Sequence, residues 1–97
     1  MIPLKQIQSL LIASKNALSE RYGIKEIGIF GSYVRNEQTD KSDIDILVSF
    51  DRPVSLLTLS SAENYLSDIL GLHVDIVPKE DVRPELRDEI LSSAVYL

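Results

Sequence analysis

Hydrophobic and polar residues follow two different periods along this chain, and these periods divide it into helices and strands. Apolar side chains recur every three or four residues in three stretches, as they do on the buried face of a helix. Shorter apolar or alternating runs lie between these stretches and favour strands. The expected helices cover residues 3–22, 55–70 and 79–92, and the expected strands cover residues 24–30, 43–48 and 72–77.

Glycine and proline mark where several of these elements end. Gly23 and Gly71 follow the first two helices and are suitable C-terminal stops. Pro78 is expected to end the third strand, and Pro84 fits the first turn of the last helix. The apolar tail, residues 94–97, is expected to pack against the rest of the chain.

Two further expectations concern packing. Leu86, Ile90 and Leu91 share the spacing of an apolar helix face, so they are predicted to face inward. Gly28 interrupts the first strand, which weakens that prediction or marks a close approach of another part of the backbone. The order of elements indicates an α/β (α+β) domain, with a small mixed sheet, helices packed on one face and acidic residues on the other.

Length and composition restrict the class of protein. The 97 residues suffice for a single domain, residues 1–97, without repeats or linkers. No apolar run approaches the roughly 20 residues that span a bilayer, and the N-terminal sequence lacks a secretion signal. The absence of cysteine excludes disulfides and thiolate catalysis, and fits a cytoplasmic location. A net charge of −5 disfavours direct, stable binding of nucleic acid.

Three carboxylates stand in two of the expected strands. Asp43 and Asp45 point to one face of their strand, with Cα atoms about 6–7 Å apart. If the second and third strands pair, Asp75 lies beside them. Clustered carboxylates raise one another's pKa unless cations neutralise them, and oxygen-only ligands favour Mg²⁺. Two such ions, about 3.5–4 Å apart, can stabilise both oxygens of a phosphoryl displacement.

A Gly-Ser turn precedes these acids. Gly31 and Ser32 lie between a strand and a short helical turn, so their backbone N–H groups can face a phosphate. Arg35, one turn later, could hold a phosphate oxygen or brace the loop through a carboxylate. Either feature alone is common in proteins, and it is their order together with the acids that indicates phosphoryl chemistry.

Other catalytic motifs do not fit. The chain has no Gly-x-x-x-x-Gly-Lys-[Ser/Thr] loop, no dinucleotide fingerprint and no calcium-binding loop of the EF-hand type. His73 is the only histidine, and no Gly-x-Ser-x-Gly elbow accompanies it. His73 is therefore interpreted as a structural or peripheral residue.

The spacing of the turn and the acids resembles that of a known superfamily. Gly31-Ser32, ten residues and then Asp43-Ile44-Asp45 resemble the Gly-Ser-x10-Asp-x-Asp signature of the DNA polymerase β-like nucleotidyltransferases. The segment Gly-Ser-x-x-Arg-x(6)-Ser-Asp-Ile-Asp-Ile and the short length are similar to the minimal nucleotidyltransferases, the MNT proteins. This resemblance covers nearly the whole chain and implies the polymerase β-like nucleotidyltransferase fold.

The resemblance assigns roles by position. It implies two Mg²⁺ ions, ATP as the substrate, and a general base that acts on the acceptor hydroxyl. The implied catalytic and metal-binding residues are Asp43, Asp45 and Asp75, with Asp75 as the base, and the implied nucleotide-binding residues are Gly31, Ser32, Arg35 and Ser42. Many relatives have glycine after the arginine, where this chain has Asn36. Asparagine tolerates a left-handed backbone, so the loop is expected to survive.

The resemblance also implies a partner. MNT proteins are commonly paired with HEPN-domain ribonuclease toxins, and act as antitoxins by transferring AMP from ATP to a tyrosine of the toxin. The catalytic core would use nearly all 97 residues, so a second protein must supply the acceptor or much of its binding surface. Two alternatives stay open: an antitoxin that neutralises the toxin only by binding it, and nucleotidyl transfer to a small molecule such as an aminoglycoside.

Overall fold

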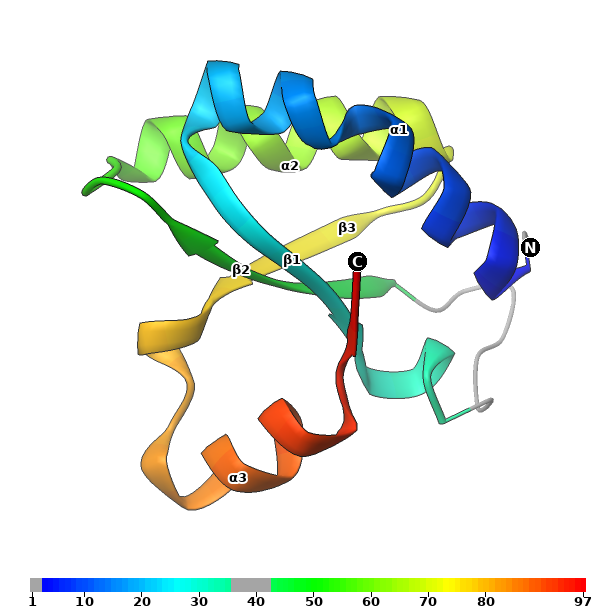
Figure 1. Ribbon diagram of the computed structural model, residues 1–97, viewed down its shortest axis with the longest axis vertical. Helices are drawn as coiled ribbons and strands as arrows, with labels where there is room; N and C mark the ends of the chain where they lie inside the picture. Colours follow the sequence, from blue (N-terminus) through cyan, green and yellow to red (C-terminus); the bar gives the residue numbers. More distant parts are fainter. Residues whose placement is uncertain (1–2, 36–42) are drawn as a thin grey trace.

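A computed structural model describes residues 3–35 and 43–97 of the protein, with Ser32 described by its backbone alone. The expected helices and strands are present, with changes near the C-terminus (Figure 1). The α-helices are α1 (Leu4–Tyr22), α2 (Leu56–Leu70) and α3 (Pro84–Ser93), and the short 3-10 helices are η1 (Gly31–Tyr33) and η2 (Lys79–Asp81). The strands are β1 (Ile24–Phe30), β2 (Ile44–Phe50), β3 (Val74–Pro78) and β4 (Val95–Tyr96).

The four strands form one sheet in the order β3-β2-β1-β4. β1 runs antiparallel to both β2 and β4, whereas β2 and β3 are parallel. The sheet is therefore mixed, as the sequence predicts. The parallel pair is connected through α2, which crosses one face of the sheet between the two strands (Figure 1).

The main core lies between the sheet and the helices α1 and α2, which cover the same face (Figure 1). Each element contributes fully or almost fully buried aliphatic side chains, and each of these contributes roughly 1.5–3 kcal/mol through removal from water. The residues with no exposed surface include Ile7, Leu11 and Leu18 of α1, Ile44, Ile46 and Val48 of β2, and Leu66 of α2. The alternation of β2 thus leaves the acidic positions on the opposite face.

The helix ends follow the local sequence. α1 ends at Gly23 and α2 ends at Gly71, each a left-handed residue with φ of 71° and 67° respectively, as predicted. α2 begins one residue later than expected, because Ser55 is its N-cap and accepts a hydrogen bond from the backbone N–H of Thr58 at 3.2 Å.

The prediction of one helix over residues 79–92 is wrong. The chain forms η2, a break, and then α3, with Pro84 in the first helical turn as expected. α3 lies on the other side of the sheet from α1 and α2 (Figure 1), and it has no fully buried residue. Leu86, predicted to face inward, is 42% exposed, while Ile90 and Leu91 are only partly covered. The expectation that the helices pack on one face therefore holds for α1 and α2 only.

The apolar tail does more than pack down. Val95 and Tyr96 form an edge strand beside β1, and the N–H of Leu97 donates to the carbonyl oxygen of Ile27 at 3.0 Å. Tyr96 pairs with Gly28, where an added Cβ would come within 3.2 Å of the tyrosine ring. The close approach predicted at Gly28 is therefore confirmed. Among the helices of residues 3–35 and 43–97, none is long and apolar enough to cross a membrane.

Candidate active site

The parallel pairing of β2 and β3 brings the acidic residues together. Asp45 is the direct partner of Asp75 in this register, and paired residues of neighbouring strands project from the same face. Just before the two strands, the N–H of Ile44 donates to the carbonyl oxygen of His73 at 3.0 Å, which fixes the segment of Asp43 against that of His73. The strand pairing on which the sequence prediction depended is present.

The side chains at these strand ends form a compact group of donor atoms. Nδ1 of His73 lies 3.3 Å from Oδ2 of Asp43 and 3.9 Å from Oδ1 of Asp75. One donor atom from each of the three residues lies within 4.8 Å of the others, close enough to share one cation. About half of each carboxylate side chain is exposed, so the group is open to solvent. Carboxylate oxygens with an imidazole nitrogen suit a divalent cation.

The clustering of the acids affects the pKa of Asp45. Its pKa is raised above the ordinary value, first by partial burial and then by the negative charges of Asp75 and Asp43. The positive charge of Arg35 acts in the opposite direction and lowers the pKa of Asp45. The net rise means that the ionised form of Asp45 is disfavoured here, first by burial and then by its acidic neighbours, and a bound cation would relieve the repulsion between the acids.

The turn at Gly31 closes on the same carboxylate. Gly31 has φ of 81°, a left-handed conformation that side chains disfavour, and its carbonyl oxygen accepts hydrogen bonds from the N–H groups of Val34 and Arg35, both at 3.2 Å. A Cβ added to Gly31 would collide with the carboxylate of Asp45. The turn therefore needs glycine both for its backbone and for its contact with the acid.

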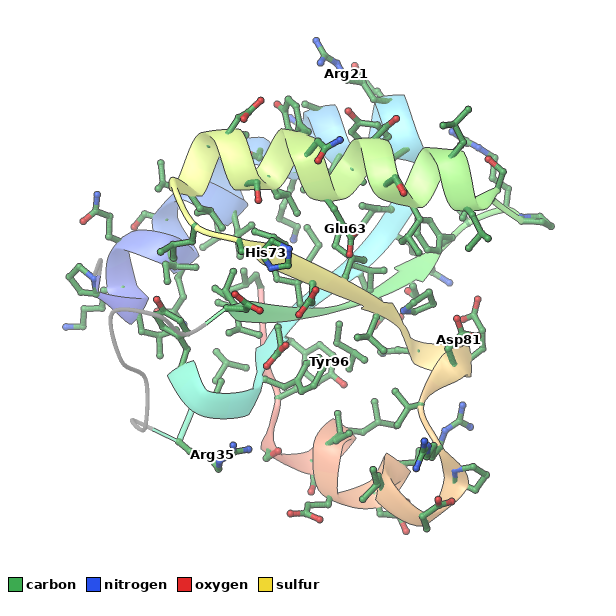
Figure 2. All side chains as sticks on the ribbon, turned by 180° about the vertical axis from the view of Figure 1, so that it is seen from behind. Arg21, Arg35, Glu63, His73, Asp81 and Tyr96 are labelled. Carbon is green, nitrogen blue, oxygen red and sulfur yellow. The ribbon has the colours of Figure 1, made fainter. Side chains whose placement is uncertain are left out.

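The structure describes the other predicted site residues to different extents. Arg35 is exposed just after η1, on the acidic side of the molecule (Figure 2), close enough for its charge to act on Asp45. The backbone of Ser32 lies in η1 beside the site, but its side chain is not described. Ser42 and Asn36 lie outside the described residues.

His73 is close to the predicted acids, although the sequence prediction of the site does not include it. The sequence interprets it as structural or peripheral, and the structure places its exposed ring beside two carboxylates at the start of β3 (Figure 2). The signal was present in the alternation of the strand. His73 and Asp75 are two residues apart, so they share a face.

Comparison with known proteins identifies the family. A model of the nucleotidyltransferase domain matches residues 11–97. The chain belongs to this nucleotidyltransferase family. It is 45% identical over 97 residues to the protein adenylyltransferase MntA of Thermococcus cleftensis, covering 100% of this chain and 98% of the relative. It is also 45% identical over 98 residues to a candidate protein adenylyltransferase of Methanocaldococcus jannaschii, with both chains covered completely. The protein is therefore a nucleotidyltransferase enzyme.

Solved structures confirm the fold of this nucleotidyltransferase. A candidate minimal nucleotidyltransferase superposes with a TM-score of 0.83 at 32% identity, covering 99% of this chain and 97% of that one. A chain from the complex of a tri-AMPylated HEPN toxin with MNT antitoxin of Shewanella oneidensis matches with a TM-score of 0.68 at 20% identity, covering 93% and 70%. At that identity, the second likeness shows the fold alone. The predicted polymerase β-like nucleotidyltransferase fold is confirmed.

Proposed function

We propose that this nucleotidyltransferase is a protein adenylyltransferase that transfers AMP from ATP to a tyrosine of a HEPN-domain toxin, and thereby acts as its antitoxin. The observation that carries the proposal is the pairing of Asp45 with Asp75 beside Asp43 and the Gly31 turn. The 45% identity to a protein adenylyltransferase over the whole chain supports the choice of substrates.

The metal would be held by the clustered acids. Asp43, Asp45 and Asp75 offer oxygen ligands at the ends of neighbouring strands, and this group of negative charges, which together with burial raises the pKa of Asp45, suits Mg²⁺. When bound, a pair of Mg²⁺ ions would neutralise charge on the attacking and leaving oxygens.

The triphosphate would lie across the turn. The backbone of Gly31 and Ser32 in η1 would supply N–H groups to a phosphate, and Arg35 stands one turn further along. By resemblance, Ser42 completes this set from the segment before Asp43. These residues would bind and orient ATP so that its α-phosphorus faces the acceptor.

The transfer itself is a single displacement. The tyrosine oxygen of the partner forms a bond to the α-phosphorus of ATP as the bond to the bridging oxygen of the β-phosphate breaks. Pyrophosphate carries away that electron pair, and the tyrosine proton passes to the carboxylate of Asp75. Positioning of the reactants and electrostatic stabilisation would supply most of the rate, as in other phosphoryl transfers.

The experiment is intact-mass spectrometry of the HEPN toxin after incubation with this protein, ATP and Mg²⁺. We expect the toxin to gain one or more AMP groups, and to gain none with the Asp43→Ala/Asp45→Ala double variant. If the toxin forms a complex but gains no mass, and the double variant neutralises it as well as the natural protein does, neutralisation is by binding alone. Modification of an aminoglycoside by the isolated protein would instead favour a small-molecule acceptor.

A further inference from the structure

His73 is the one member of the donor group that the reaction above does not use. Its ring lies between two carboxylates on neighbouring segments, with Nδ1 3.3 Å from Asp43 and 3.9 Å from Asp75. Its side chain is 67% exposed, so packing in the core does not explain this position. Figure 2 shows His73 at the start of β3.

The backbone holds His73 in place. Its carbonyl oxygen accepts the N–H of Ile44 at 3.0 Å, the first bond of the parallel pairing, so the Cα of His73 is fixed relative to Asp43 and Asp45. The same nitrogen approaches both Asp43 and Asp75. A cation bound between those two carboxylates would therefore have Nδ1 within reach, because one donor atom of each residue lies within 4.8 Å of the others.

We propose that His73 is a nitrogen ligand of the metal site, and that it makes the site bind a first-row transition-metal ion, with Mn²⁺ as the probe, more tightly than Mg²⁺. The inference rests on the proposed function, because it assumes that the carboxylates bind the catalytic cation. Imidazole suits transition metals, whereas Mg²⁺ prefers oxygen ligands and retains its waters. In the ligating form of the ring, Nδ1 turns its lone pair to the cation and Nε2 carries the proton.

The test is direct binding of MnCl₂ and MgCl₂ by calorimetry to the natural protein, His73→Ala and His73→Gln. We expect His73→Ala to weaken Mn²⁺ binding about tenfold while Mg²⁺ binding changes by less than about twofold, in line with the loss of one ligand or its support. His73→Gln is the matched control, since it keeps a polar donor near Asp43 but has no imidazole. It should lose the preference for Mn²⁺ as His73→Ala does.

A spectroscopic measurement supplies an independent readout. With Mn²⁺ bound, pulsed electron paramagnetic resonance should detect coupling to a directly bound ¹⁴N nucleus in the natural protein, and none in His73→Ala. Asp68→Ala removes an exposed carboxylate of α2 outside the site, and it should leave both affinities and the nitrogen coupling unchanged.

The outcomes separate this inference from the proposed function. Suppose that both ions bind, and that His73→Ala either lowers the two affinities equally or changes neither of them. His73 is then no ligand, and only the inference fails. If His73→Gln keeps the Mn²⁺ preference, His73 acts by positioning Asp43, which also overturns it. If the natural protein binds neither ion, the metal site and the proposed function fail together.

Discussion

At the residue scale, Asp45 shows how this site opposes the stability of the fold. Burial and the charges of Asp75 and Asp43 raise its pKa above the ordinary value of 3.8. A raised pKa means that the folded state favours the protonated acid more than the unfolded state does. That contribution is present below pH 3.8 and is lost as the pH rises through the folded pKa, so ionised Asp45 destabilises the metal-free fold at neutral pH.

The first prediction is that Asp45→Asn raises the melting temperature of the metal-free protein at neutral pH. Exposed like-charge interactions contribute about 0.5 kcal/mol, and each kcal/mol moves Tm of such a domain by about 4–8 °C, so we expect a rise of roughly 2–4 °C. Thermal unfolding in EDTA measures it, with Asp68→Asn as the control that should show almost no change. A lower Tm for Asp45→Asn would contradict the prediction.

A second prediction concerns the contact of Gly31 with Asp45. Gly31→Ala places a side chain on a left-handed backbone, at about 1–2 kcal/mol, and also drives a Cβ into the Asp45 carboxylate. Gly71→Ala is a matched control, because Gly71 has φ of 67° but no atom within 4 Å of an added Cβ. We expect Gly31→Ala to be the more destabilising variant and to lose ATP binding, measured by calorimetry. Equal effects of the two variants on Tm and on ATP binding would count against a closed turn at Gly31.

The candidate site was largely predictable because its chemistry depends on strand parity and spacing. The face shared by Asp43 and Asp45 follows from alternation alone, and the position of Asp75 needs only the pairing of β2 with β3. The short distances from His73 to Asp43 and Asp75 were not predictable in this way. Alternation places His73 on the same face as Asp75, but a sequence does not contain side-chain distances.

At the scale of the elements, α2 supports the strand that carries Asp75. β3 is an edge strand of the sheet, and the N–H of Ile76 donates to Oε2 of Glu63 on α2 at 2.9 Å. Figure 2 shows Glu63 pointing from α2 toward β3. This bond satisfies an edge N–H group and ties the helix to the residue that follows Asp75.

The third prediction is that Glu63→Ala loosens this edge. Loss of the bond should cost about 1 kcal/mol in the free energy of unfolding and should speed amide hydrogen exchange at Ile76. Glu63→Gln keeps an acceptor oxygen and should lie close to the natural protein. An unchanged exchange rate at Ile76 in Glu63→Ala would show that the carboxylate does not protect this N–H.

Elements were predictable in proportion to their length and to the apolar surface that they meet. The long periodic helix α1 and the strand β1 appear where the sequence places them, within one residue. β4 is only two residues long, and its pairing with Gly28 is a long-range contact without a local signal. The inward face expected for α3 failed because periodicity reports a helix but not what covers it.

A salt- and pH-sensitive contact joins three elements away from the site. Glu26 of β1 accepts a hydrogen bond from Ser49 of β2 at 3.0 Å and pairs with Lys79 of η2 at 3.3 Å. The pKa of Glu26 is lowered from 4.5, first by the hydrogen bond from Ser49 and second by Lys79. Its contribution to stability is therefore present above pH 4.5 and is lost as the pH falls through the folded pKa.

The fourth prediction follows from the lowered pKa of Glu26. Glu26→Gln should lower the free energy of unfolding at neutral pH by less than about 1 kcal/mol, as is usual for exposed pairs, and the difference from the natural protein should shrink in acid. Urea unfolding across the acidic range measures both. A difference that grows as the pH falls below 4.5 would contradict the assignment.

At the scale of the whole molecule, cation binding should be visible as added stability. The fifth prediction is that Mg²⁺ raises the melting temperature, because it binds the folded arrangement of Asp43, Asp45 and Asp75 and relieves their repulsion. At a concentration of about 100 times Kd the gain is about 2.7 kcal/mol. Thermal unfolding across a Mg²⁺ titration, with and without ATP, tests this.

The Asp43→Ala/Asp45→Ala variant is the control for that titration. It should start from a higher Tm in EDTA and respond little to Mg²⁺. A Tm of the natural protein that stays constant across the titration would exclude the acids as a cation site under those conditions.

The in-register pairing of Asp45 with Asp75 also determines what a misfolded molecule, with β3 paired in the wrong register, could do. If β3 docked one residue out of register, every side chain of the strand would exchange faces, so Asp75 would turn into the core and Val74 or Ile76 toward solvent. Such a molecule would be less stable and would at the same time lose Asp75 from the proposed site. Molecules with the wrong register would therefore be inactive, and would not catalyse a different reaction. For this nucleotidyltransferase, correct assembly of the sheet would therefore be a condition for activity.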